Sequence, residues 1–346
     1  MNRLAHRPGL DGVRGLAIIM VVAGHCLGLY AGWAQRGVLG VDLFFVLSGF
    51  LITTLLVEEW QRDGSLNLRE FFVRRGRRLL PALIVLVGVF AFLTLLVVPA
   101  RAPETGLEAL LRLSYVANFF IAFSGHGVGA GFNHLWSLAQ EEQFYLLWPP
   151  VLFLLLHKRM SPSRLLVLLL VVIAAVNLQR LAVVTAGEDR HRIWFSPDTH
   201  SDAIVFGCAA ALVWKYRLLR IPATRWAWAL VATVFVGALV FFDPLRTSTF
   251  PASLPLFAVA SAVGIIVLLD SPAALPSRLF ATRPMQAMGK VSYSLYLWHA
   301  PLIVFFGIIG LPVAVAASIL SYRYVEKPFR RRSRAPVALP AAARAR

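Results

Sequence analysis

Two ionisable side chains lie in the first apolar stretch of the chain, where a membrane helix ordinarily carries neither. Arg14 and His25 are eleven residues apart within the run from Leu10 to Tyr30. On an α-helix this spacing is roughly three turns, so both side chains face one side, about 16 Å apart along the axis. An ionisable group inside a membrane costs several kcal/mol unless it is paired or lines a wet cavity. The pair is therefore a candidate site that holds a cation and a proton acceptor.

Each of these residues also has a structural explanation. Arg14 could mark the cytoplasmic edge of the helix and extend to the lipid headgroups. His25 could be an interior histidine whose hydrogen bonds are satisfied. Asp42 enters the second apolar run close in sequence to the end of the first. It could orient His25 or keep it protonated, or it could simply complement a helix dipole.

Two adjacent carboxylates, Glu141 and Glu142, follow His134 in an apolar run rich in tryptophan. Burying both is costly, so at least one is expected to face a cavity, where it could bind hydroxyls or act as a base with a raised pKa. The alternative is a structural ion pair with an arginine of another membrane helix.

A cluster of arginines, Arg74, Arg75, Arg77 and Arg78, precedes Pro81 in the loop between the second and third apolar runs. Guanidinium groups at a helix entrance can hold phosphates through bidentate, charge-assisted hydrogen bonds. Basic residues also gather on the cytoplasmic side of membrane proteins for reasons of topology alone, so both interpretations stand.

Three later segments carry further polar groups. Tyr296 and His299 could bind a donor substrate or brace the bundle, and Glu326 could be ion-paired with Arg323 at the cytoplasmic face. The other polar residues in these segments are Asp202, Tyr293, Tyr322 and Lys327.

The composition is that of a multi-span membrane protein. Of 346 residues, 58% are hydrophobic and only 15% charged, against about 25% charged in soluble domains. The mean hydropathy is +0.71. The net charge of +17 comes from Lys and Arg in short segments between apolar runs, a pattern typical of cytoplasmic loops rather than of nucleic-acid binding. Cys26 and Cys208 show no metal-ligand spacing and lie within apolar runs, so neither a disulfide nor a metal site is expected.

Hydropathy and the positive-inside rule predict an all-α integral membrane protein with about ten transmembrane helices and both termini cytoplasmic. Gly106 to Phe123 is expected to be a re-entrant or interfacial helix on the outer side. Residues 1–329 would form one transmembrane domain, and residues 330–346 a disordered basic tail near anionic lipid. The predicted helices are Leu10–Tyr30, Val38–Val57, Leu79–Val98, Leu135–Leu156, Leu165–Val184, Ala203–Trp214, Trp226–Phe242, Ser253–Leu269, Val291–Gly307 and Ile308–Tyr324.

An ordered series of motifs resembles the bacterial membrane acyltransferase-three family, relatives of the O-antigen and macrolide-sugar O-acyltransferases. The motifs run from Leu10 to Phe329 and read LDGVRGLAIIMVVAGH, GVDLFFVLSGFLIT, RRGRRLLPAL, HLWSLAQEEQFYLLWP, SYSLYLWHAPL and YRYVEKPF. The resemblance implies acyl transfer from cytoplasmic acyl-CoA to a hydroxyl group, usually on a sugar.

The family pattern of an arginine and a histidine on the first helix maps onto Arg14 and His25. Its arginine motif maps onto Arg75 and Arg78, and its acidic motif in the last span onto Glu326. Two features depart from the family. His200, where an arginine is usual, precedes Asp202 near the sixth span, and only a short basic tail follows the last span, where some members carry a hydrolase-like domain.

We therefore expect an O-acyltransferase of the cell membrane that moves an acyl group, acetyl being the simplest, from acyl-CoA to a carbohydrate or glycosylated acceptor. The phosphates of acyl-CoA would bind Arg14 and the arginines of residues 74–78, and no permanently bound cofactor, metal or nucleic acid is expected. His25 would act as general base or as nucleophile, roles that the sequence leaves open. The alternative function is a multi-pass transporter of a small charged solute, with the same buried groups forming its path.

Overall fold

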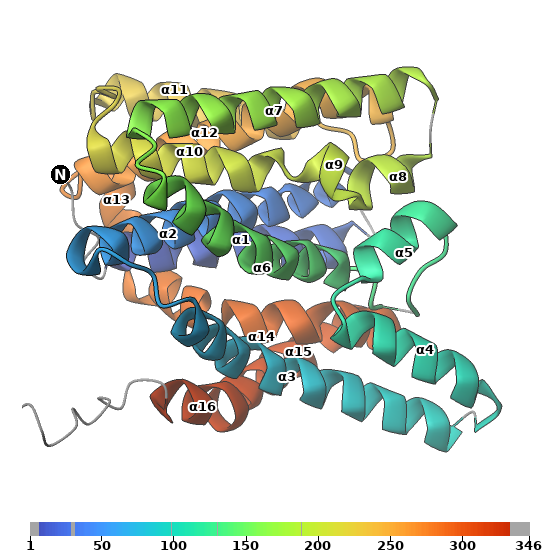
Figure 1. Ribbon diagram of the computed structural model, residues 1–346. Coiled ribbons are helices and arrows are strands. Elements are labelled where there is room, and N and C mark those ends of the chain that lie inside the picture. The colour runs from blue at the N-terminus through green and yellow to red at the C-terminus, as the bar shows by residue number, and fades with distance from the viewer. Residues whose placement is uncertain (1–6, 29–31, 98, 130, 188, 333–346) are drawn as a thin grey trace, which may run out of the picture.

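The structure, a computed structural model, describes residues 7–28, 32–97, 99–129, 131–187 and 189–332. These residues form helices and connecting turns, with no strand among them. The long helices run back and forth between the two ends of a bundle (Figure 1). The prediction of an all-α architecture is thus confirmed.

The body of the bundle consists of the longer helices α1 (Pro8–Leu27), α2 (Gly40–Asp63), α3 (Leu68–Val97), α6 (Leu135–His157), α7 (Pro162–Thr185), α10 (Asp202–Tyr216), α11 (Arg225–Phe241), α12 (Phe250–Asp270), α14 (Arg283–Phe306) and α15 (Gly310–Leu320). Shorter helices connect them, namely α4 (Ala102–Leu113), α5 (Ala117–Ser124), α8 (Arg190–Phe195), α9 (Pro197–His200), α13 (Leu275–Phe280) and α16 (Lys327–Arg332). The 3₁₀ segments are η1 (Gly32–Leu39), η2 (Pro99–Arg101), η3 (Thr247–Thr249) and η4 (Gly307–Ile309), and η5 (Ser321–Glu326) is a π-helix.

Each of the ten predicted apolar segments contains a helix. Six helical stretches among the described residues are long and apolar enough to cross a membrane. One of these, residues 283–329, holds both of the last two predicted segments, while α10 and α11 have only 15 and 17 residues. The exact number of ten membrane crossings therefore stays a prediction.

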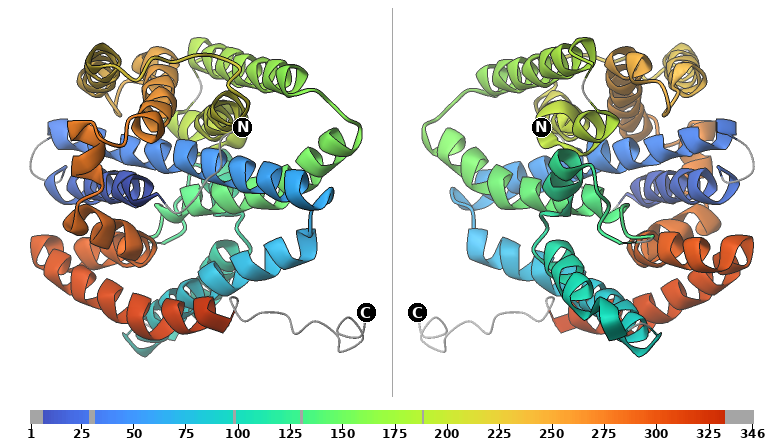
Figure 2. Two further views of the ribbon diagram at one scale, coloured as in Figure 1. Left: turned by 90° about the vertical axis from the view of Figure 1, so that its left-hand side faces the viewer. Right: turned by 90° about the vertical axis from the view of Figure 1, so that its right-hand side faces the viewer.

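The segment that was expected to be re-entrant is bent. Residues 103–113 and 117–124 form two helices whose axes differ by 118° at the break between them. They lie with α8 at one end of the bundle, whereas both ends of the described chain lie at the other (Figures 1 and 2). Two termini on one side are what the predicted topology requires. Residues 333–346, most of the predicted basic tail, fall outside the described residues.

The arginine cluster lies on a helix and not, as predicted, in a loop. Gly64 ends α2 in the left-handed conformation (φ 67°), and the Asn67 side chain accepts a hydrogen bond from the Glu70 amide at 3.0 Å. Such a side-chain cap satisfies a free amide in the first turn of a helix. Because α3 therefore begins at Leu68, about ten residues earlier than predicted, the arginines have a fixed helical spacing.

Helices α1 and α2 lie in the middle of the bundle, where α1 packs against α14 and α2 against α10. Glycines allow both contacts. A Cβ atom on Gly49 would lie 2.0 Å from the Ile204 oxygen, and one on Gly289 would lie 1.9 Å from the Asp11 oxygen. Small residues let helix backbones approach closely in membrane proteins. These approaches fix the position of α1, which carries Arg14 and His25, and of α2.

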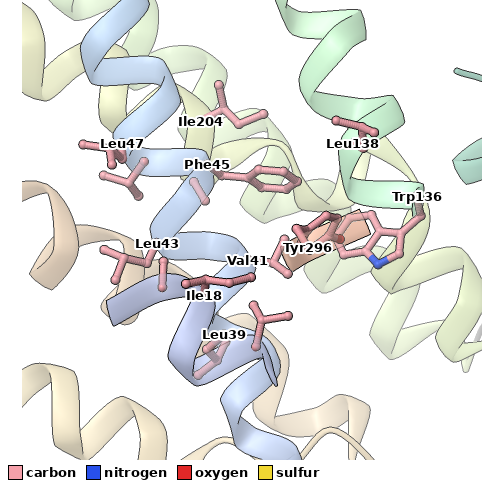
Figure 3. Close-up of a cluster of buried hydrophobic side chains, with 14 of the residues drawn as sticks. Ile18, Leu39, Val41, Leu43, Phe45, Leu47, Trp136, Leu138, Ile204 and Tyr296 are labelled. Atoms are coloured by element: carbon pink, nitrogen blue, oxygen red, sulfur yellow. The ribbon is translucent and has the colours of Figure 1, made fainter. Parts of the chain in front are cut away.

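A buried apolar cluster surrounds the first turns of α2 (Figure 3). Ile18 of α1, Leu43 and Leu47 of α2, Leu138 of α6 and Ile204 of α10 meet there and are almost fully buried. The cluster holds α1, α2, α6 and α10 together beside the polar residues described next.

Candidate functional site

Three adjoining cavities run into the bundle. The vestibule, of about 880 Å³, is lined by Arg7, Leu10, Asp11, Arg14, Leu51, Ile52, Leu55, Leu56, Glu58, Glu59, Arg62, Asp63, Asn67, Glu70, Phe71, Arg74, Arg75 and Arg78. The chamber, of about 60 Å³, shares Arg14, Arg75 and Arg78 with it. The histidine pocket, of about 150 Å³, shares Val41 and Tyr296 with the chamber and is also lined by His25, Val38, Asn133, His134, Trp136, Trp194 and Phe195. A wide opening thus narrows to a small chamber that adjoins the pocket of His25.

The helical spacing of the arginine cluster decides which members reach the cavities. Arg75 and Arg78, three residues apart, line both the vestibule and the chamber, and Arg74 lines the vestibule. Residues three apart share a helix face, and the face that holds Arg75 and Arg78 is the one that reaches the chamber. Arg77, predicted as a phosphate ligand with the others, is exposed and lines none of the three cavities.

Inside the chamber, the Glu141 carboxylate of α6 accepts hydrogen bonds from hydroxyl groups of two helices. The hydroxyls of Ser48 on α2 and Tyr145 on α6 both donate to Glu141 Oε1, and the two hydroxyl oxygens lie 2.9 Å apart. The Arg75 guanidinium lies 3.8 Å from the centre of the Tyr145 ring, within cation–π range. Glu141 is therefore the cavity-facing member of the predicted carboxylate pair. Glu142 does not line any of the three cavities, and its buried Oε1 has no hydrogen-bond partner among the residues that the structure describes.

Three histidines meet at the far end of α1. The rings of His25 and His299 lie 5.0 Å apart between centroids, and those of His134 and His299 lie 5.2 Å apart. His25 Nδ1 contacts the Val21 oxygen at 2.9 Å and His299 Nε2 at 3.4 Å. No group of three or more His, Cys, Asp or Glu side chains in the described part of the chain is arranged to bind a metal ion.

Two residues predicted to bind the donor, Tyr296 and His299, lie at this end, and only Tyr296 shares a cavity with the arginines. His299 is fully buried beside His25. The Tyr296 ring lies between the chamber and the histidine pocket, and its hydroxyl bonds to Ser137 and to the His134 oxygen.

Sequence proximity suggested that Asp42 could contact His25, but the structure pairs it with His200 instead. Its Oδ1 lies 3.0 Å from His200 Nε2, and both side chains are fully buried. The other nitrogen of His200 lies 2.7 Å from the Trp194 oxygen, and its ring stacks on Trp136 with centroids 5.4 Å apart. The first turn of α2 faces α9 and α10, so this aspartate braces the wall behind the histidine pocket.

Sequence reasoning missed Arg180, a fully buried arginine on α7. It forms an ion pair with Asp202 and donates to the Thr199 oxygen at 2.7 Å and to Asn177 Oδ1 at 3.2 Å. The family has an arginine beside the aspartate motif where this chain has His200, and here α7 supplies a guanidinium to that aspartate. An arginine in the predicted apolar segment 165–184 was the available signal.

Glu326 lies outside the three cavities as well. It is almost fully buried in the π-helix η5 and accepts a hydrogen bond from the Ser294 hydroxyl of α14. It thus joins α14 to the segment after α15 and is not placed to touch a molecule in the vestibule.

The model of a family described as "Acyltransferase domain" matches residues 7–322. The peptidoglycan O-acetyltransferase OatA of Listeria monocytogenes is 32% identical over 351 residues, which cover 94% of this chain and 56% of that protein. The O-acetyltransferase OatA of Staphylococcus aureus is 31% identical over 360 residues, covering 94% and 57%. The putative peptidoglycan O-acetyltransferase YrhL of Bacillus subtilis is 32% identical over 351 residues, covering 93% and 55%. The chain thus spans a little over half the length of these curated relatives. No solved structure matches.

Proposed function

The chain belongs to the acyltransferase family, and from this premise we propose that it is a multi-pass O-acyltransferase of the cell membrane that moves an acetyl group from acetyl-CoA to a carbohydrate hydroxyl. The observation that carries the proposal is the series of adjoining cavities, which joins an arginine-lined vestibule to the pocket of His25. A transferase needs a donor site and an acceptor site that meet at a base or a nucleophile.

The vestibule suits the nucleotide part of the donor. Arg74, Arg75 and Arg78 of α3 line it, and guanidinium groups can form paired, charge-assisted hydrogen bonds to phosphates. A chamber of about 60 Å³ holds only a few molecules the size of water, so the nucleotide would stay in the vestibule. The acyl group at the end of the flexible arm of CoA would enter the chamber.

His25 is the reacting group of this proposal. Its Nδ1 is engaged by the Val21 oxygen and by His299, whereas no protein partner of its Nε2 is found in the part of the chain that the structure describes. Nε2 would take the proton of the acceptor hydroxyl as a general base, or attack the thioester and carry the acetyl group for a time.

The histidine pocket suits an acceptor with apolar ring faces and polar edges. Trp136, Trp194, Phe195 and Tyr296 supply aromatic surface, and Asn133 supplies an amide. The apolar faces of a sugar ring can pack on aromatic rings, while its hydroxyls need polar partners. The names of the two peptidoglycan O-acetyltransferases among the relatives support a glycan of the cell envelope as the acceptor.

We propose the topology that the basic segments favour. Both ends of the described chain and the start of α3 lie at the vestibule end of the bundle, and placing this end in the cytoplasm puts the basic clusters inside. The vestibule would then open toward cytoplasmic acetyl-CoA, and the histidine pocket would lie toward the outer face.

The proposal is tested by mass spectrometry of peptidoglycan and other surface glycans from cells with and without this protein. Glycans from cells with the protein should contain species heavier by one acetyl group, and these species should vanish when the gene is removed. Identical glycan masses in the two samples, together with accumulation of a small solute in one of them, would favour the transporter function instead.

A further inference from the structure

His25 and His299 form a pair of histidines. The Nδ1 atom of each ring faces backbone carbonyl oxygen, and the Nε2 atom of His299 faces the Nδ1 atom of His25. His299 Nδ1 lies 3.0 Å from the Leu295 oxygen and 2.8 Å from the Tyr296 oxygen. His299 Nε2 lies 3.4 Å from His25 Nδ1, which in turn lies 2.9 Å from the Val21 oxygen.

The carbonyl oxygens determine which nitrogen of each ring carries the hydrogen. A carbonyl oxygen only accepts, so a ring nitrogen facing one must carry hydrogen. In neutral rings the Nδ1 atoms of both His25 and His299 are therefore the donors, and both Nε2 atoms have free lone pairs. The Nε2 of His299 consequently offers a lone pair to the same N–H of His25 that also donates to Val21. The Nδ1 atoms of both rings and the Nε2 atom of His299 thus have compatible partners.

We propose that His299 is a positioning residue that holds His25 in its Nδ1–H form and shares the proton that His25 gains during acyl transfer. The proposal rests on the proposed function. With hydrogen on Nδ1, the free lone pair of His25 is on Nε2, which is the atom that must face the acceptor.

The groups around His25 leave this role to His299. No carboxylate is found among the described residues that line the histidine pocket. Asp42 contacts His200, and Glu141 accepts from Ser48 and Tyr145 in the chamber. No hydrogen bond between the nearby His134 ring and His25 is found among the described residues, so this ring does not hold His25. A second imidazole thus occupies the place that a carboxylate has in many hydrolases, behind the base and opposite the reacting atom.

The proton balance of the transfer step fits the pair. As the acceptor oxygen bonds to the acyl carbon, its proton passes to His25 Nε2. The resulting cation is shared along Nδ1–H with His299 Nε2, while the two carbonyl oxygens stay bonded to His299 Nδ1–H. The C–S bond then breaks, the thiolate of CoA takes the proton back, and both histidines return to the neutral form. No oxidant, reductant or additional reactant is needed.

Two substitutions of His299 distinguish a role in positioning His25 from a role in packing alone. Gln places its amide oxygen as many bonds from Cβ as Nε2 of histidine, so His299→Gln keeps an acceptor for His25 Nδ1–H but cannot take a proton. His299→Leu keeps apolar volume and removes the acceptor. The matched control is His126→Gln, an exposed histidine outside the three cavities.

The first readout is steady-state kinetics of the purified protein, in which kcat and KM are determined separately. Acetyl-CoA is the donor and a lysozyme digest of peptidoglycan is the acceptor probe. We expect His299→Leu to lower kcat about 100-fold with both KM values unchanged, the size of effect that misplacement of a catalytic group causes. His299→Gln should lie between Leu and wild type, and His126→Gln should match wild type. An equal loss of kcat in His299→Gln and His299→Leu, or a change confined to KM for acetyl-CoA, would overturn the positioning role.

The second readout does not need activity. In protein labelled with ¹⁵N-histidine, solid-state NMR distinguishes protonated from unprotonated ring nitrogens, and the His25 signals are those missing in His25→Gln. We expect His25 to be Nδ1–H in wild type and in His299→Gln, and a mixture of both neutral forms in His299→Leu. An unchanged His25 spectrum in His299→Leu would refute the inference. Wild-type protein that shows the expected spectrum but transfers no acetyl group would instead refute the proposed function.

Discussion

Replacing Arg75 and Arg78 together by Gln should weaken the binding of CoA about 25-fold to 150-fold. Both guanidinium groups line the vestibule and the entrance to the chamber. A hydrogen bond to a charged group contributes about 1.5–3 kcal/mol. The vestibule is open to solvent, so we take about 1–1.5 kcal/mol for each arginine, because solvent screens exposed charges. Since about 1.4 kcal/mol is a factor of ten, losing both gives the stated range.

The same helix offers a matched control. Arg77→Gln removes an equal charge at the position before Arg78, but this side chain is exposed and lines none of the cavities. It should change the affinity for CoA less than about twofold, through long-range attraction alone. The deficit of the double variant relative to wild type should shrink as salt rises from low to physiological concentration, where charges are screened within about 8 Å.

The assay is calorimetric titration of CoA into the purified variants in lipid nanodiscs, followed by measurement of KM for the acceptor. We expect the loss in CoA affinity with little change in KM for the acceptor. An unchanged affinity for CoA, an equal loss in Arg77→Gln, or a loss confined to the acceptor would refute the assignment of the vestibule to the donor.

The other predictions concern topology and stability. Ser65 follows α2 and Arg190 begins α8; both are exposed, and the two segments lie at opposite ends of the bundle. Of cysteines placed at these two positions, only the one at 190 should react with an impermeant maleimide added to cells, and labelling at 65 would reverse the topology. Arg180→Met leaves a buried aspartate without its cation and should destabilise the protein by about 3–5 kcal/mol in thermal unfolding; an unchanged midpoint would show that the ion pair is dispensable. Gly49→Ala places a Cβ 2.0 Å from a backbone oxygen and should lower the unfolding midpoint, whereas Gly237→Ala, with nothing within 4 Å, should keep or raise it.

Sequence patterns predicted the helices well, because the length of an apolar run is a local property. The runs around α6 and α7 match their helices within three residues at each end, whereas α2 continues six residues beyond the predicted Val57. The start of α3 was misplaced because its first turns are basic and only the side chain of Asn67, not hydropathy, marks the beginning of the helix. That error also concealed which arginines share a face.

Partners across the bundle were the least predictable part of the site. Glu141 was expected to face a cavity, but its bond to Ser48 joins residues 93 positions apart, and the contact between His25 and His299 joins residues 274 apart. Such pairs follow from how the helices pack, which hydropathy does not encode. Asp42 shows that proximity in sequence can indicate the wrong partner, since its side chain contacts His200, which lies 158 positions away.

The most direct test of the central claim is acetyl transfer by purified His25→Ala and His25→Gln. Radiolabelled acetyl-CoA and a lysozyme digest of peptidoglycan serve as donor and acceptor probe. Both variants should remain folded and bind CoA, yet transfer should fall by at least about 100-fold to 10,000-fold, because neither side chain can take a proton. Label retained on wild type without acceptor, but not on the variants, would indicate an acetyl-histidine, and no retained label would favour general-base catalysis. Near-normal transfer by His25→Ala, or its rescue by Gln, would contradict the account.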